Sequence, residues 1–313
     1  MNPANPARQT PGFAALGLDV GGTKIAAGLV SFPDGRLQLR RQIPTRPERG
    51  AAEVLRDVVE LTGELAAAAG PLGLRVNAIG LGVCELVDLA GDIVSSNCLA
   101  WQGGEVRERL SAVAPVVIEA DVRAAALAEA LFGAGQRYRS FIYLTVGTGI
   151  ASSLVLDGRP FAGARGATGT VASSPLPRLG VPWDSGEAVT LEQIASGPAL
   201  VSRFNLLQGQ AQTGQEVIAA AEAGNASALS VVRSAAAALG ATIGWLVNVL
   251  DPEAVVIGGG LGLSAGPYWE GLEVSARKHI WSELHRDLPI VRALTGPDAG
   301  LIGAAAAAWK KFA

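Results

Sequence analysis

LDVGGT (residues 18–23) and LTVGTG (residues 144–149) share one pattern, in which an apolar strand stops on a turn of glycine and threonine. A second apolar strand follows each turn through a tight corner, over residues 25–32 and within residues 150–161. Two strands joined in this way are typical of a β-hairpin. The repetition is a weak internal symmetry, and it indicates two domains built on one plan, each opening with a hairpin.

Short strands and helices alternate along the rest of the chain, which is typical of an α/β protein with mixed sheets. Residues 51–70 have the apolar spacing of a helix, and Gly70 is placed to end it. Residues 174–187 contain three prolines and predict a loop. The expected division of the chain is a disordered tail (1–13), a first domain (14–120) that a final helix (about 300–313) rejoins, and a second domain (121–299).

The composition of the 313-residue chain narrows the class of protein. Hydrophobic residues make up 49% and charged residues 17%, which is enough apolar material for a sizeable core. The formal net charge is −3 and no basic stripe is present, so we expect no nucleic-acid partner. No signal peptide and no apolar run of about 18 residues is present, so we expect no membrane partner. The two cysteines, Cys84 and Cys98, lack zinc-site spacing and suit a cytoplasmic protein.

Glycine-rich turns follow three strands, in DVGGTK (19–24), TVGTG (145–149) and IGGGLG (257–262). Glycine permits positive φ and close approach of the backbone to a ligand. Successive backbone N–H groups in such turns form anion-binding nests, and threonine hydroxyls add further donors. Three ordinary tight turns, with Lys24 pointing into solvent, are the alternative interpretation. The candidate nucleotide-binding residues are Gly21, Gly22, Thr23, Lys24, Thr145, Gly147, Thr148, Gly149, Gly258, Gly259 and Gly260.

Other nucleotide and hydrolase motifs fit the sequence poorly. The Walker pattern is absent, and a dinucleotide fingerprint starting at Gly260 would leave too little chain for the rest of that fold. The stretch GLSAG (262–266) matches a nucleophile elbow, with His279 and His285 downstream. An elbow serine stands directly at a strand end, whereas Ser264 lies inside a glycine-rich loop. A hydrolase and an oxidoreductase therefore remain as alternatives only.

The order and spacing of the three turns resemble the ROK family of repressors, open reading frames and kinases. The resemblance covers nearly the whole chain from residue 14. It implies two actin-like (ribonuclease H-like) domains flanking a nucleotide-binding cleft, and transfer of the γ-phosphoryl group of ATP, with Mg²⁺, to a sugar hydroxyl. Repressors of this family carry a DNA-binding domain before the first turn, and the short stretch before residue 14 favours the kinase branch. The resemblance continues through ADVRAAALAEALFGAG (120–135), GARGATG (163–169), LEQIASGPAL (191–200) and AGLIGAAAAA (299–308).

The resemblance also implies roles for individual residues. Asp121 matches the aspartate that takes the proton of the sugar hydroxyl as general base; it also has the position of a helix N-cap, and the two roles are compatible. Asp19 would hold Mg²⁺ through water, or alternatively stabilise the first turn. Glu192 matches a sugar-contacting glutamate, and Glu85 and Asn97 would also lie on the sugar side. A homodimer is implied as well.

The sequence departs from the family pattern in the sugar pocket. Ala120 and Arg123 stand where the family has asparagines, and Thr170 and Ser173 replace a glutamate and a histidine. The zinc cysteines of the family are missing, and residues 174–191 contain no cysteine or histidine, so we expect no structural zinc. Each buried donor left unpaired costs about 1–3 kcal/mol, which predicts an unusual sugar-like substrate. A non-catalytic nucleotide or metabolite sensor on the same fold is the alternative function.

Overall fold

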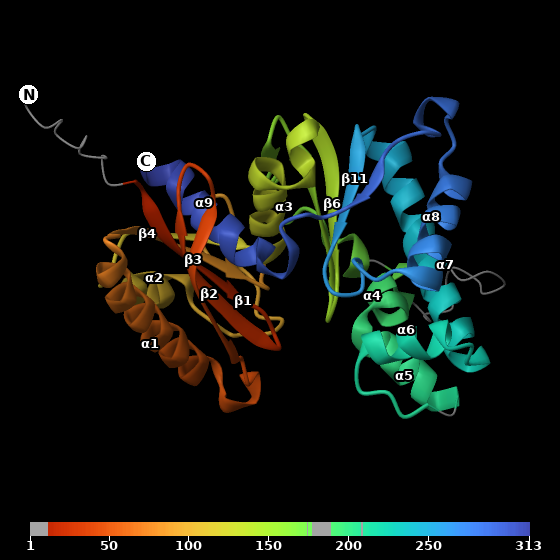
Figure 1. Ribbon diagram of the computed structural model, residues 1–313, viewed down its shortest axis with the longest axis horizontal. Coiled ribbons are helices and arrows are strands. Elements are labelled where there is room, and N and C mark those ends of the chain that lie inside the picture. The colour runs from red at the N-terminus through yellow and green to blue at the C-terminus, as the bar shows by residue number, and fades with distance from the viewer. Residues whose placement is uncertain (1–11, 174, 177–188, 208) are drawn as a thin grey trace, which may run out of the picture. The chain divides into compact units, whose positions relative to one another are not determined.

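The computed structural model describes residues 12–173, 175–176, 189–207 and 209–313 (Figure 1). The chain divides into two compact units. Unit 1 comprises Met1–Ala125 and Gly300–Ala313, and unit 2 comprises Ala126–Ala299. The chain passes from unit 1 to unit 2 inside α3 (Asp121–Phe132) and returns at the start of α9 (Ala299–Phe312).

Unit 1 is built on a five-stranded mixed sheet. Its strands are β1 (Ala14–Val20), β2 (Lys24–Ser31), β3 (Arg36–Pro44), β4 (Val76–Val83) and β5 (Val116–Ala120). Their order is β3-β2-β1-β4-β5. The first three strands pair antiparallel, β4 runs parallel to β1, and β5 runs parallel to β4. Strand β1 is buried along almost its whole length, as expected of a central strand that is covered on both faces.

Large apolar side chains cover one face of this sheet. Leu16, Leu18 and Leu81 alternate with smaller residues along β1 and β4, so they all point to this face. They form a core with the apolar side of two helices, α1 (Ala51–Ala69) and α2 (Gly103–Ser111). This burial accounts for most of the stabilisation of unit 1, since it removes the largest apolar area from water.

The other face of the sheet carries glycine where α9 crosses it. A Cβ added to Gly17 would overlap the backbone of Leu301, and one added to Gly80 would overlap the backbone of Ala304. Since neither strand has a side chain at these positions, the alanine-rich helix lies directly on the backbone of the sheet.

Unit 2 repeats the plan of unit 1. Its strands are β6 (Ser140–Val146), β7 (Ile150–Leu156), β8 (Arg159–Pro160), β11 (Ala254–Gly258) and β12 (Ile290–Arg292). Their order is β12-β11-β6-β7-β8, with β6, β7 and β8 antiparallel and with β11 and β12 parallel to β6. The predicted pair of mixed sheets, each with a leading hairpin, is confirmed. A separate small ribbon pairs β9 (Pro175–Leu176) with β10 (Val189–Thr190).

Helices make up much of the remaining chain. The α-helices of unit 2 are α4 (Leu191–Ala195), α5 (Gly197–Leu207), α6 (Gly214–Glu222), α7 (Ala226–Leu250) and α8 (Gly266–His279). Helices α7 and α8 lie side by side (Figure 1) and meet where Gly240 and Gly244 leave room for the backbone of α8. Short 3-10 helices cover Pro47–Arg49, Gly70–Leu72, Ala134–Arg137, Thr170–Ser173, Glu283–His285 and Gly296–Asp298.

Helix α7 is the one helix among the described residues that is long and apolar enough to cross a membrane, with a hydropathy of 1.4. Of the 18-residue stretch of α7 to which this value applies, 61% is buried inside the structure. Val232, Leu239 and Ile243 are fully or almost fully buried in the core of unit 2. A core helix passes the same test of length and composition, and the burial of α7 is that of a core helix.

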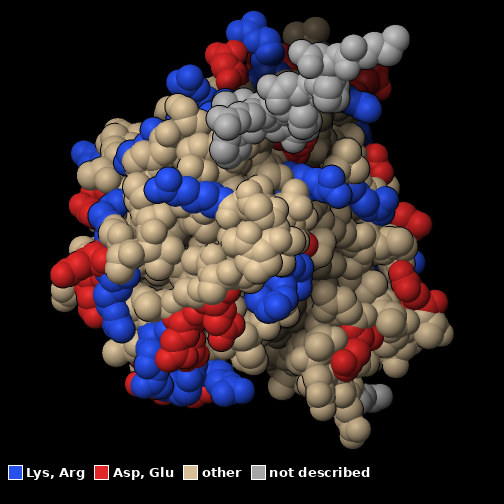
Figure 2. Space-filling view, turned by 60° about the vertical axis from the view of Figure 1, so that its left-hand side comes forward, with Lys and Arg blue, Asp and Glu red and all other residues tan. Residues whose placement is uncertain are grey.

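One sequence expectation differs from the structure, and another lies almost entirely outside the described residues. The alanine-rich stretch after Arg123 predicts a helix over residues 124–132, whereas helix α3 begins three residues earlier, at Asp121. The loop predicted over residues 174–187 lies almost entirely outside the described residues. On the face shown in Figure 2, lysine and arginine side chains are interspersed with aspartate and glutamate, and they form no continuous basic area on that face.

Candidate active site

The first glycine turn closes the β1–β2 hairpin of unit 1. The N–H of Gly21 donates to the carbonyl oxygen of Lys24 at 3.0 Å. Thr45, which is buried just after β3, donates its hydroxyl to the carbonyl oxygen of Gly21 at 2.6 Å. Thr23 and Lys24 themselves are exposed. The turn is therefore held by Thr45, while the side chains of Thr23 and Lys24 are exposed to solvent, where a phosphate could approach them.

Asp19 lies beside this turn, on the face of the sheet that α9 covers. Its carboxylate occupies the space that a Cβ on Gly300 would need. Magnesium in phosphoryl-transfer sites is commonly held by one or two carboxylates together with water and phosphate oxygens. A carboxylate at this position fits such an ion. Across the described ranges, no group of three or more His, Cys, Asp or Glu residues is placed to hold a metal by itself.

Asp121 begins α3, directly after β5. It is partly buried, and its Oδ1 accepts a hydrogen bond from the N–H of Val122 at 2.6 Å. Burial, followed by the negative charge of Asp19 and more weakly that of Glu85, raises the pKa of Asp121 to about 7. A carboxylate that titrates near neutral pH is well matched to taking a proton from a hydroxyl.

Glu85 follows β4 and is buried, with 4% of its surface exposed. Its Oε1 accepts hydrogen bonds from the N–H groups of Cys98 at 2.6 Å and Leu99 at 2.9 Å. Its Oε2 accepts from the N–H of Asn97 at 2.8 Å and from the hydroxyl of Ser95. Burial by itself would raise the pKa of Glu85, but these hydrogen bonds together lower it. The charge of Glu85 is thus directed at the protein's own backbone.

Asn97 is exposed, and its Nδ2 lies 3.5 Å from the hydroxyl of Ser95. The next residue, Cys98, places its Sγ against the first turn, 3.0 Å from where a Cβ on Gly22 would stand. No local pattern predicts this contact, because residues 22 and 98 are far apart in the chain. The structure therefore joins two predicted features of unit 1, the sugar-side loop and the first phosphate turn.

Arg123 is buried in α3, two residues after Asp121. Its guanidinium donates from Nε to Glu119 Oε1 at 2.6 Å and from Nη2 to the carbonyl oxygen of Val87 at 2.6 Å. The expected asparagine is thus replaced by a residue that pairs with an acid and also binds the backbone after β4. Glu119 lies in β5 and Arg123 in α3, so the ion pair spans the junction of the strand and the helix.

The second glycine turn closes the β6–β7 hairpin of unit 2. The N–H of Gly147 donates to the carbonyl of Gly149 at 2.9 Å, and the N–H of Gly197 at the start of α5 donates to the carbonyl of Gly147 at 2.8 Å. Glu192 Oε2 accepts from the N–H of Ile150 at 2.8 Å. Thr148 is exposed and Thr145 is partly buried. Glu192, expected on the sugar side, therefore holds the turn in place.

The third glycine turn follows β11 and joins the second within unit 2. Gly258 pairs in register with Thr145, and the N–H of Leu261 donates to the carbonyl of Val146 at 2.9 Å. Gly259 has a φ of 82°, and a Cβ there would overlap the backbone of Val146. The turn thus needs glycine for its backbone conformation and for its close contact with β6.

Gln215 was not predicted from the sequence. It lies on the first turn of α6, and its Nε2 is 2.8 Å from where a Cβ on Gly260 would stand. A cavity of about 350 Å³ also opens beside the second turn. It is lined by Thr148, Glu192, Gln193, Ser196, Pro198, Ala199 and Ser202.

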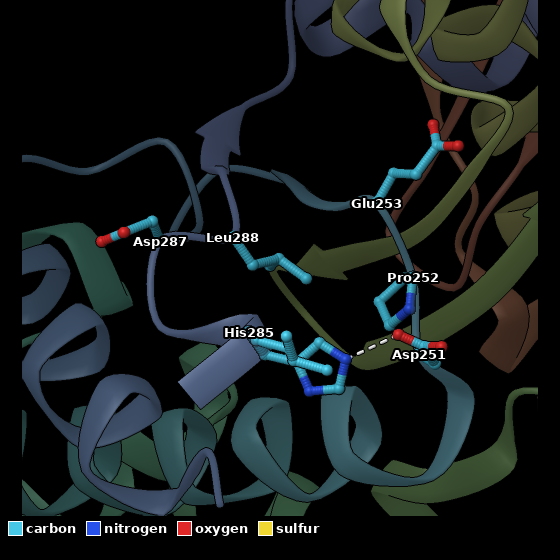
Figure 3. A pocket seen from close by; sticks show the side chains of 7 residues that line it. Asp251, Pro252, Glu253, His285, Asp287 and Leu288 are labelled. Atoms are coloured by element: carbon cyan, nitrogen blue, oxygen red, sulfur yellow. Dashed lines mark hydrogen bonds and ion pairs between the residues drawn. The ribbon is translucent and has the colours of Figure 1, made fainter. Parts of the chain in front are cut away.

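A second cavity, of about 460 Å³, has none of the predicted site residues in its lining (Figure 3). Its lining residues are Asp251, Pro252, Glu253, Leu284, His285, Asp287 and Leu288. His285 Nε2 bonds Asp251 Oδ1 at 2.6 Å, and His279 Nδ1 bonds the carbonyl oxygen of Ser275 at 2.7 Å. Ser264 donates to the carbonyl of Gly260 at 3.3 Å. The serine and the two histidines considered for a hydrolase are each bonded to other groups.

The replaced zinc-motif positions are only partly described. Thr170 and Ser173 lie on a short 3-10 helix, and both are exposed. Residues 177–188 and Ser174, which carry much of the region where the family has its zinc cysteines, lie outside the described residues. The expectation of no structural zinc therefore stays a prediction from the sequence.

A family model described as the ROK family matches residues 15–311. The chain belongs to the ROK family. The match covers both units and all three glycine turns, so the family resemblance predicted from the sequence is confirmed. The fold of the two mixed sheets is the actin-like ATPase fold of ROK kinase structures.

Among curated proteins, the chain is similar to a bifunctional enzyme NanE/NanK of Brucella melitensis, with 35% identity over 94% of this chain and 54% of the relative. The chain thus spans about half the length of this curated relative.

Two solved structures are similar over nearly their full length. A ROK hexokinase from Thermus thermophilus matches with a TM-score of 0.78 and 35% identity, over 96% of this chain and 99% of that one. A ROK family glucokinase from Streptomyces griseus, in complex with glucose and AMPPNP, matches with a TM-score of 0.80 and 26% identity, over 95% and 99%. ROK-family sugar kinases are therefore relatives of this chain.

Proposed function

We propose that this ROK-family chain is an ATP-dependent kinase that phosphorylates a hydroxyl of a sugar or sugar-like molecule, with Asp121 as general base. The observation that carries the proposal is the carboxylate of Asp121, which begins α3 and has its pKa raised to about 7 by burial and by Asp19. A sugar hydroxyl is a poor nucleophile while it keeps its proton, and a carboxylate that titrates in this range can accept that proton.

In the proposed reaction, the exposed donors of the glycine turns bind the phosphates of ATP. Thr23 and Lys24 would do so in unit 1, and Thr148 and Gly149 in unit 2. Glycines 258–260, with Gln215 beside Gly260, would lie against the adenosine. Phosphoryl transfer depends mostly on positioning and electrostatics, which such backbone nests supply.

Asp19 would hold Mg²⁺ through water in this reaction. The ion, when bound, neutralises charge on the phosphates. The proton of the sugar hydroxyl passes to the carboxylate of Asp121, the sugar oxygen forms its bond to the γ-phosphorus, and the bond between that phosphorus and the β–γ bridging oxygen breaks. The products are a sugar phosphate and ADP.

Turnover of ATP tests the proposal. The chain should release ADP in the presence of at least one member of a panel of hexoses, N-acetylated hexosamines and sugar alcohols. The Asp121→Asn variant should bind ATP and the same sugar while losing turnover. Binding of nucleotide and sugar without turnover by the wild type would favour the sensor alternative, and equal turnover by the variant would contradict the role of Asp121.

We also infer a homodimer in solution, formed through unit 2. Trp245 is 56% exposed on α7, and Trp281 is 86% exposed after α8. The two segments are joined, because Asn248 Oδ1 accepts from the N–H of Trp281 at 2.9 Å. Val249 on α7 and Val274 on α8 are further large apolar side chains that are exposed. Large exposed apolar patches commonly mark contacts with other chains. Light scattering of the wild type and of Trp281→Glu tests this inference, since the variant should be monomeric.

We infer a cytoplasmic location as well, since Cys84 and Cys98 are both free thiols. Free thiols persist in reducing compartments, where ATP is also available. Fractionation of cells that express the chain tests this inference.

A further inference from the structure

Glu85 is an unusual residue to find buried at the end of a strand. A carboxylate without partners would be costly at 4% exposure, because burial removes its water. Glu85 instead accepts from four donors, and all four come from one segment, Ser95–Leu99. Three of these donors are successive backbone N–H groups. The single carboxylate thus satisfies three successive backbone N–H groups of this segment.

The hydroxyl of Ser95 strengthens this arrangement. It accepts a hydrogen bond from the N–H of Leu86 at 2.8 Å and donates its own proton to Glu85 Oε2. Every group around the carboxylate is therefore a donor, and only an ionised carboxylate can accept from all of them. A glutamine side chain has the same size but carries donors on one of its two terminal atoms, so it would meet some of these N–H groups donor to donor.

The segment that Glu85 holds is also the one that reaches the proposed site in unit 1. Asn97 has its side chain exposed there, while Cys98 lies against Gly22 of the first turn. Trp101, a little further along, donates its Nε1–H to the carbonyl of Ala51 at 2.8 Å and ends the excursion in the core. Glu85 therefore determines the position of Ser95–Leu99, whose neighbours are the first turn at Gly22 and the core at Trp101.

We propose that Glu85 is a positioning residue, whose carboxylate holds Ser95–Leu99 so that Asn97 meets the sugar while Cys98 packs on the first phosphate turn. This role differs from the direct sugar contact expected of Glu85 from the sequence, since both carboxylate oxygens face the segment. The proposal rests on the proposed kinase function for its effect on catalysis. The proposal also predicts that Glu85 protects the backbone N–H groups of residues 97–99 from exchange, which can be measured without any activity.

The test compares Glu85→Gln with Asp88→Asn. Asp88 lies three residues away in the same excursion, and its Oδ1 accepts from the N–H groups of Ala90 at 2.9 Å and Asp92 at 2.8 Å. Both of these donors belong to the turn that Asp88 itself begins, and neither lies in Ser95–Leu99. Both substitutions replace a carboxylate by its amide, so they match in size and in change of charge.

Glu85→Gln should raise the KM for the sugar by about tenfold, as expected when a hydrogen bond to a charged group is lost, and leave the KM for ATP near the wild-type value. Asp88→Asn should leave both constants unchanged. A merely structural role would lower the folded fraction and the apparent kcat and leave both KM values as they were. An unchanged sugar KM in a well-folded Glu85→Gln variant would overturn the proposal.

Hydrogen–deuterium exchange provides the second measurement. The backbone N–H groups of residues 97–99 should exchange at least about tenfold faster in Glu85→Gln than in the wild type, and at the wild-type rate in Asp88→Asn. Unchanged exchange in Glu85→Gln would overturn the proposal whether or not the chain phosphorylates any sugar. If the exchange changes as expected but the wild type phosphorylates none of the panel, the kinase function fails while the positioning of the segment stands.

Discussion

The guanidinium of Arg123 and the carboxylate of Glu119 form an ion pair at 2.6 Å across the junction of β5 and α3. The same guanidinium donates to the carbonyl oxygen of Val87, in the segment that follows β4. Asp121 lies between the two members of the pair in the chain. The pair therefore braces the strand end, the start of the helix and the neighbouring loop around the proposed general base.

Arg123→Met should destabilise the protein. The substitution keeps the length of the side chain but leaves Glu119 without its charge partner and the Val87 carbonyl without this donor. Arg123 is buried while 29% of the Glu119 side chain is exposed, so losing this pair and the bond to Val87 should cost about 1–3 kcal/mol, which thermal or urea unfolding will detect. Arg139→Met is the matched control, because Arg139 pairs with Asp157 while 82% of its side chain is exposed. The control should unfold as the wild type does; equal unfolding of both variants would contradict the bracing role.

Asp121→Asn should lower kcat by about 10²- to 10⁴-fold, which is the usual contribution of a general base. The KM values for sugar and ATP should change little, because the amide keeps the shape of the side chain. Initial rates of ADP release check this prediction. A loss that appears in KM alone would indicate that Asp121 binds the sugar without taking its proton.

The rate should also depend on pH through Asp121. The residue must be ionised to accept a proton, so kcat/KM should rise with pH through about 7, the pKa to which burial and Asp19 bring this carboxyl, and level off above it. The charged or titratable groups that act on this pKa are Asp19 and Glu85, and Cys84 lies close enough to feel the charge of Asp121. A profile flat from pH 5 to 8 would contradict the assignment.

The same raised pKa predicts an effect on stability. The pKa of Asp121 in the folded state, about 7, exceeds the ordinary value of 3.8, so the folded protein binds this proton more tightly than the unfolded chain does. The stabilising effect of protonation is therefore complete below about pH 4 and is lost as the pH rises through about 7. Asp121→Asn, which carries no charge, should raise the free energy of unfolding at pH 8 by on the order of 1–2 kcal/mol and leave it unchanged at pH 4. Thermal unfolding at the two pH values measures the difference.

Gly300→Ala should disturb Asp19. A methyl group there would overlap the carboxylate of Asp19, which must then move. We expect a several-fold higher Mg²⁺ concentration for half-maximal activity, because this carboxylate would be displaced from the ion. Gly63→Ala in α1 is the control, since a Cβ there meets nothing within 4 Å. Because alanine favours the helix more than glycine does, the Gly63→Ala variant should be slightly more stable, with an unchanged Mg²⁺ requirement. An unchanged requirement in Gly300→Ala would argue against Asp19 as the magnesium residue.

Much of the fold could be predicted from the sequence because its signals are local. Apolar strands that stop on Gly-Gly-Thr or Gly-Thr-Gly predict hairpins wherever they occur, and their repetition predicted two sheets on one plan. Asp19 and Asp121 could be identified as candidates because both stand at predicted strand ends and the family resemblance implies roles for them there. The start of α3 was placed three residues late, because the alanines from 124 onward dominate the helix signal.

The partners of the polar side chains could be decided only by the tertiary structure. Glu85 was predicted to face a sugar, but its oxygens accept from residues 95–99, which the chain brings back only after an excursion from β4. Glu192 likewise bonds Ile150, which lies in another element. A carboxylate accepts from whichever donors surround it after folding, and a pattern of residue types does not specify which donors those are. The sequence by itself determined the family, the two hairpin-led sheets and the glycine turns, since these depend on local backbone preference and hydrophobic period. The tertiary structure decided which carboxylates hold the backbone and which stand near neutral pKa, since burial and neighbouring charge arise only when distant segments pack together.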